Sequence, residues 1–117
     1  MYLDKTEVSV VFHLDETAKT QMTIKNILNL LADERLMVKE LALIVNGEAI
    51  VELRRSSERE KDILHLIQVN VAVYACRNAM KSSNIEESDL TSGVISVASG
   101  VGQLALLQTA HFAYIRP

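Results

Sequence analysis

The sequence predicts an α/β domain with a mainly parallel five-stranded sheet and helices on both faces. Short β-branched runs alternate with helix-forming segments along the chain, which gives the order β-α-β-α-β-α-β-α-β. Each connection exceeds the roughly dozen residues that a parallel crossover needs, and such crossovers are right-handed. A chain of 117 residues can bury one sizeable core but not two, so we expect a single domain over residues 1–117.

Composition excludes several classes of protein. The chain has 49% hydrophobic and 23% charged residues, which is ordinary for a soluble domain. A net charge of −3 and 4% aromatic residues argue against a nucleic-acid partner. A single cysteine cannot form an internal disulfide, and no apolar run approaches the roughly 20 residues that span a membrane. We therefore expect a cytoplasmic protein without a membrane or nucleic-acid partner.

The first half of the chain supplies two strands and two helices. Residues 8–14 form a β-branched strand, and the acidic residues that follow begin a helix over about 18–33. Its apolar residues fall at helical spacing. Residues 38–45 are a second strand, which Asn46-Gly47 ends before a helix over 48–53.

The second half repeats this alternation after a charged segment. Residues 54–62 are interpreted as a solvated turn and the first helical turn. The helix then continues with Ile63, Leu64 and Ile67 on its apolar face, and a strand from Val69 gives way to a helix at Cys76. A polar loop over 84–92 and a strand over 94–98 follow. The last two elements are a helix that begins at Ser99-Gly100, with Val101, Leu104, Ala105 and Gln108 on one face, and a strand over 113–115.

Polar and small residues follow the predicted strands, where ligands of parallel sheets bind. They are His13, Asp15, Asn46, Gly47, Cys76, Asn78, Ser99 and Gly100. We expect Val71 and Val73 in a central strand with the Val8 strand beside it. In the strand order 2-1-3-4-5, His13 and Cys76 would then share one edge of the sheet.

Five segments together resemble the DsrE/DsrF-like family, in its small stand-alone branch. They are FHLDE (12–16), VNGEAI (45–50), ACRNAM (75–80), SGVGQL (99–104) and AYIRP (113–117), and they span almost the whole chain. The resemblance implies a three-layer α/β/α flavodoxin-like domain that forms homotrimers or hexamers. It also implies a sulfur relay, in which a cysteine carries a persulfide between donor and acceptor proteins. Cys76 is the only candidate for that cysteine.

Cys76 has two interpretations that the residues leave open. A thiol at the start of a helix, at least partly accessible, could act as a nucleophile, because the helix dipole favours a thiolate. Alternatively, it is a small buried apolar residue. His13 could stabilise the thiolate or move a proton, and so be catalytic with Cys76, or it could anchor the strand end with Asp15 as its partner. Arg77 is a second candidate for stabilising the thiolate.

The sequence leaves open two alternative functions, each of a different class. One is a non-catalytic module that binds a small anion through Asp15, Asn46, Gly47, Asn78, Ser99 and Gly100, with Cys76 as packing. The other is a structural assembly subunit.

Residues 100–105 match G-x-G-x-x-A, but the chain ends before the acidic residue that a dinucleotide site needs. A single cysteine and no close histidine pair fall short of a zinc site, so we expect no cofactor and no metal.

Overall fold

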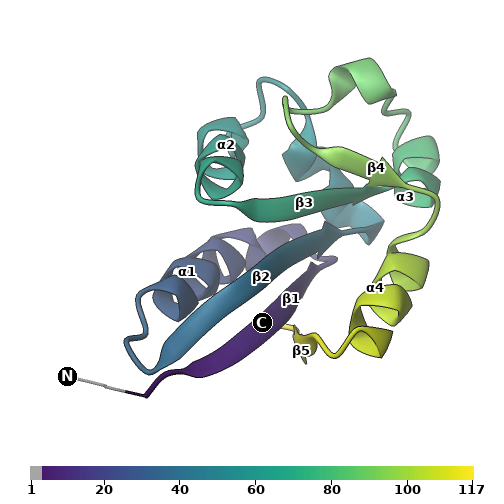
Figure 1. The fold of residues 1–117 in the computed structure, drawn as a ribbon. Helices are drawn as coiled ribbons and strands as arrows, with labels where there is room; N and C mark the ends of the chain where they lie inside the picture. The colour runs from purple at the N-terminus through teal and green to yellow at the C-terminus, as the bar shows by residue number, and fades with distance from the viewer. Residues whose placement is uncertain (1–3) are drawn as a thin grey trace.

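A computed structural model describes residues 4–117, which form a five-stranded parallel sheet with helices on both faces (Figure 1). The strands are β1 (Thr6–Leu14), β2 (Leu36–Val45), β3 (Val71–Cys76), β4 (Ile95–Val97) and β5 (Ala113–Ile115). The α-helices are α1 (Thr20–Leu31), α2 (Glu60–Gln68), α3 (Arg77–Ser82) and α4 (Gly100–Thr109). Three 3₁₀ helices, η1 (Thr17–Lys19), η2 (Gly47–Leu53) and η3 (Glu87–Asp89), lie in the connections. The predicted fold class is confirmed.

The order of the strands differs from the expected one. It is β4-β3-β2-β1-β5, and every neighbouring pair is parallel. The chain moves one strand along the sheet at each step from β1 to β4, then returns to the far side of β1. The expectation that the first and third strands are neighbours is therefore wrong, because β2 separates them. Alternating patterns fix the direction of each crossover but not the strand beside which it lands.

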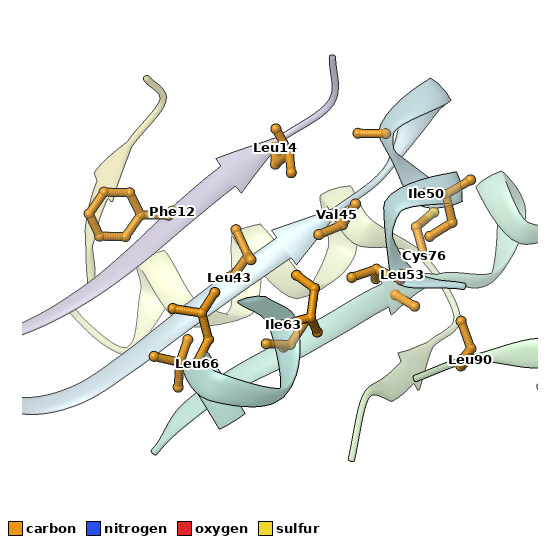
Figure 2. Close-up of a cluster of buried hydrophobic side chains, with 14 of the residues drawn as sticks. Phe12, Leu14, Leu43, Val45, Ile50, Leu53, Ile63, Leu66, Cys76 and Leu90 are labelled. Atoms are coloured by element: carbon orange, nitrogen blue, oxygen red, sulfur yellow. The ribbon is translucent and has the colours of Figure 1, made fainter. Parts of the chain in front are cut away.

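Successive strand residues alternate between two apolar clusters, as a strand buried on both faces requires. Phe12, Leu43 and Val73 belong to the larger cluster, which α1, α2 and α3 also line. Figure 2 shows part of this cluster, with Cys76 labelled among its side chains. Val11 and Ile44 face the opposite side, where Leu104 of α4 covers them. The helices thus form a thick layer on one face and a single helix on the other.

Helix α4 is apolar on more than its covered side. Leu104 is buried, whereas Val101 is 66% exposed and Leu106 is 67% exposed. The sequence predicted one apolar face on this helix, but apolar residues also lie on its exposed side. A surface helix of a monomer normally presents polar residues to water, so the outer side of α4 is suited to an interface.

One exposed ion pair fixes the turn between α1 and β2. The Arg35 side chain donates to both carboxylate oxygens of Asp33, with its Nε 3.0 Å from Oδ1 and an Nη 2.7 Å from Oδ2, and the Arg35 backbone N–H donates to Oδ1 at 2.9 Å. These hydrogen bonds lower the pKa of Asp33 from 3.8 to about 2. A lowered folded-state pKa contributes stability that is present above pH 3.8 and is lost as the pH falls toward 2.

The substitution Arg35→Gln should raise the pKa of Asp33 toward its ordinary value. It should not restore it fully, because the backbone N–H at position 35 still donates to the carboxylate. Titration of the Asp33 carboxyl by NMR measures this directly, with Lys39→Gln as the control of equal charge change. An Asp33 titration that is the same in the wild type and in Arg35→Gln would contradict the assigned cause.

Candidate functional site

Cys76 lies at the carboxyl end of β3 and is the N-cap residue of α3. It borders a cavity of about 470 Å³ that is also lined by Asn46, Gly47, Glu48, Asn78, Ala79, Ser82 and Ser83. The thiol-bearing residue is only 6% exposed, so it is less accessible than expected from the sequence. It also stands one position before the expected first turn. Helix α3 has only six residues, and we assign no anion site to its N-terminus.

The connections after β3 and β4 leave the sheet toward opposite faces. Helix α3 joins the larger apolar cluster through Ala79 and Met80, whereas α4 covers the other face through Leu104. In open α/β sheets, ligands bind in the crevice where neighbouring strands send their connections to opposite faces. Cys76 pairs with Val97 at that point. Cys76 therefore stands beside the point where these connections diverge, whereas the cavity that it borders lies between the residues that follow β2 and helix α3.

Gly100 lets the first residues of α4 lie directly behind the cysteine. A Cβ atom at this position would be 3.2 Å from the Cβ atoms of both Cys76 and Asn46. Ser99 does not contribute a free hydroxyl here, because its Oγ accepts a hydrogen bond from the Gly102 N–H at 2.8 Å and caps α4. Of these two predicted site residues, Gly100 shapes the site and Ser99 holds the helix.

His13 is held between Asn46, which follows β2, and Tyr114 of β5. Its Nδ1 lies 2.6 Å from the Tyr114 hydroxyl, and its Nε2 lies 2.9 Å from Oδ1 of Asn46. An amide oxygen only accepts, so Nε2 donates to Asn46, and in the neutral ring Nδ1 accepts from Tyr114. His13 does not line the Cys76 cavity, but Asn46 does. The histidine therefore reaches the cysteine site through the amide of Asn46.

Asp15 pairs with Arg116 and not with His13, which was its expected partner. Its two carboxylate oxygens each accept from a guanidinium nitrogen of Arg116 at 3.1 Å, and Glu16 lies beside the same group at 3.5 Å. This pairing raises the pKa of Arg116, chiefly through the hydrogen bond to Asp15. Asp15 thus ties the end of the chain to the strand end next to His13, and it does not line the cavity.

A carboxylate stands at the mouth of the cavity. Glu48 accepts from the Thr17 hydroxyl at 2.6 Å and from the Thr17 N–H at 2.9 Å. The hydroxyl is the main cause of a pKa for Glu48 below its ordinary value. Glu48 is therefore ionised at neutral pH, and its negative charge disfavours an anionic ligand in this cavity.

Arg77 points to a different neighbour. Its Nε lies 3.1 Å from the Ser96 hydroxyl and 3.3 Å from the Glu87 carboxylate, and it does not line the Cys76 cavity.

A family model for the DsrE/DsrF-like family matches residues 7–117, which is nearly the whole chain. The chain belongs to the DsrE/DsrF-like family.

Two solved structures support the assignment of the fold. The protein MTH1491 of Methanobacterium thermoautotrophicum, described as a protein of unknown function, is 33% identical to this DsrE/DsrF-like chain. The match covers 97% of this chain and 100% of that one, with a TM-score of 0.84. The ychN protein of E. coli is 16% identical over 97% of this chain and 99% of its own, with a TM-score of 0.70, and shows the fold alone. Comparison with curated proteins finds no match.

The structure adds site residues that the sequence analysis missed. Glu48, Ser82 and Ser83 line the cavity, and Tyr114 holds His13. Tyr114 could have been found only by placing β5 beside β1, since Tyr114 and His13 are far apart in the sequence.

No helix within residues 4–117 is long and apolar enough to cross a membrane. The described residues also contain no group of three or more metal-binding side chains arranged for an ion.

Proposed function

We propose that this DsrE/DsrF-like protein carries sulfane sulfur as a persulfide on Cys76. The observation that carries the proposal is the place of the only cysteine, which stands at the carboxyl end of β3 and borders a cavity between the residues that follow β2 and helix α3. Membership of the family adds support at the level of the family only.

The transfer is a pair of thiol exchanges that needs no external oxidant. The Cys76 thiolate attacks the outer sulfur of a donor persulfide, an S–S bond forms at Cys76, and the donor leaves as a thiolate. An acceptor thiolate then attacks the outer sulfur of the Cys76 persulfide, and Cys76 leaves as a thiolate. One sulfur atom moves at each step, and the total number of S–S bonds does not change.

Asn46 and His13 have separate roles in this proposal. Asn46 lines the same cavity as Cys76, and in this proposal its amide N–H₂ group donates a hydrogen bond to the outer sulfur. His13 is a positioning residue, because its Nε2 donates to Oδ1 of Asn46 and so directs the amide N–H₂ group away from the ring. Tyr114 completes this arrangement from β5.

The lining of the cavity argues against the anion-binding module. The ionised Glu48 carboxylate repels an anion, and the Ser99 hydroxyl is engaged as a helix cap. No lysine or arginine lines the cavity. A volume of about 470 Å³ suits a small donor or an extended acceptor segment.

Cys76 should react with iodoacetamide in the folded protein, more slowly than in the unfolded chain. The residue is 6% exposed but borders an open cavity, so a small reagent can reach the sulfur without unfolding. A bulky maleimide should react far more slowly under the same native conditions. Because the chain has one cysteine, mass spectrometry of the intact protein counts every labelled thiol without ambiguity.

The dependence on denaturant decides the outcome. Labelling through the cavity proceeds at a rate that low concentrations of urea leave unchanged. Labelling that appears only as the protein unfolds globally would make Cys76 a packing residue and would end the carrier proposal.

A further part of the proposal is that the protein works as a homo-oligomer in which a second copy covers α4. Val101 and Leu106 are both more than half exposed on this helix, and Ile95 and Tyr114 add exposed apolar surface on β4 and β5. Apolar surface of this kind is unusual on a monomer and typical of an interface. The resemblance to the family points to a trimer or a hexamer.

A further inference from the structure

A second cavity, of about 490 Å³, lies between the loop that follows η2 and the 3₁₀ helix η3. The loop residues 54–57 form one wall, and Ser88 and Asp89 form the other. Within the described part of the chain, Val51 is the only apolar residue in the lining. None of these residues lines the Cys76 cavity, so the two cavities are separate.

Arg54 and Arg55, which line this cavity, differ from every other arginine in residues 4–117. The others each pair with a carboxylate: Arg35, Arg59, Arg77 and Arg116. No described carboxylate is within ion-pair distance of Arg54 or Arg55. Both side chains belong to exposed residues, so this wall carries two positive charges that the chain itself does not neutralise.

Backbone pairing holds the two walls of the cavity together. Arg54 and Leu90 form an antiparallel bridge, the Arg55 N–H donates to Asp89 O at 2.7 Å, and the Thr91 N–H donates to Leu53 O at 2.8 Å. The Arg55 Nε donates to Ser88 O at 3.2 Å, which orients its guanidinium and leaves the terminal nitrogens available. The cavity is therefore formed before any ligand arrives.

The available groups are mostly hydrogen-bond donors. Ser57 is engaged, because its hydroxyl donates to Glu52 O and accepts from the Arg59 N–H. The Ser56 and Ser88 hydroxyls have no partner among residues 4–117. The Asp89 carboxylate accepts from the Glu86 N–H at 2.8 Å, and with two arginines present the lining keeps a net positive charge.

We propose that this cavity binds a small dianion with a tetrahedral oxyanion group, either a phosphate monoester or a sulfate. Guanidinium groups bind such oxygens in bidentate fashion, and two of them with two hydroxyls offer more donors than one carboxylate can accept. No aromatic residue among residues 4–117 lines the cavity, so the ligand is recognised through its oxyanion group and not through a stacked ring.

The test is a titration of the ¹⁵N-labelled full-length protein with inorganic phosphate, sulfate and chloride at constant ionic strength. Phosphate or sulfate should produce saturable shifts in the amide signals of Ser56, Ser57 and Ser88, whereas chloride should not. Tighter binding of phosphate would favour a phosphate monoester as the ligand, and tighter binding of sulfate would favour a sulfate. The double variant Arg54→Gln/Arg55→Gln should weaken binding by about tenfold or more. Lys61→Gln, an exposed change of charge nearby in α2, should leave binding within about twofold.

Four results would overturn this assignment. The first is a response to chloride equal to that to phosphate and sulfate, and the second is unchanged binding in the double variant with its fold retained by circular dichroism. The third is tighter binding of a glutamate-rich peptide than of either oxyanion, which would assign the arginines to an acidic protein. Shifts at Asn46 and Gly47 instead of Ser56 and Ser88 would place the anion at the Cys76 cavity and would overturn the proposal as well.

Discussion

Replacing Leu43 with alanine should lower the free energy of unfolding by about 2–5 kcal/mol. Leu43 is fully buried in β2, the central strand of the sheet, and belongs to the larger apolar cluster. Truncation removes its apolar contacts and leaves a cavity that the surrounding strands and helices cannot fill. For a domain of this size such a loss is a large fraction of the total stability, which is typically about 5–15 kcal/mol.

Urea unfolding at a fixed protein concentration measures this effect. Met37→Ala is the matched control, because Met37 lies on the same strand and is 54% exposed. It should change stability by no more than about 0.5 kcal/mol. Equal losses in the two variants would mean that the larger cluster does not hold the sheet together as described.

Leu106→Glu should dissociate the proposed homo-oligomer into monomers. Leu106 is 67% exposed on α4, so the substitution leaves the folded monomer almost unaffected. In an interface between copies it would bury an unpaired carboxylate at each contact, which is strongly unfavourable. Light scattering should report a multiple of the 13.0 kDa chain for the wild type and a single chain for the variant.

Met22→Glu serves as the control for this change. Met22 is 51% exposed on α1, on the opposite face of the sheet from α4, and the substitution adds the same charge. We expect it to keep the wild-type mass. A wild-type protein that is monomeric at micromolar concentration would refute the oligomer, and dissociation by Met22→Glu alone would place the interface on α1.

The sequence predicts the strands well because their physical signal is local. Residues 41–45 form a continuous apolar run, as a strand buried on both faces must, and Asn46-Gly47 ends it where Gly47 adopts a φ of +57°. The switch from strand to helix at Cys76 is also found within one residue. These features depend on neighbours in the chain, so the sequence alone is sufficient.

The order of the strands and the contacts of the site depend on residues far apart in the chain. His13 was expected beside Cys76, but β2 lies between their strands, and Asn46 links the two positions instead. Tyr114 reaches His13 only because β5 returns to β1. Of the polar and small residues predicted at the strand ends, Asn46, Gly47, Cys76 and Asn78 line one cavity, whereas the partners of His13 and Asp15 required the structure.

The most direct test of the proposed function is the mass of the intact protein after exposure to a sulfur donor. The reduced wild-type protein is incubated with cysteine persulfide, freed from excess donor and measured alongside Cys76→Ser. The proposal predicts that the wild type gains the mass of one sulfur atom, that a thiol acceptor removes it, and that Cys76→Ser gains nothing. A wild-type protein that gains no sulfur although iodoacetamide reaches its thiol, or an equal gain in Cys76→Ser, would contradict a persulfide carried on Cys76.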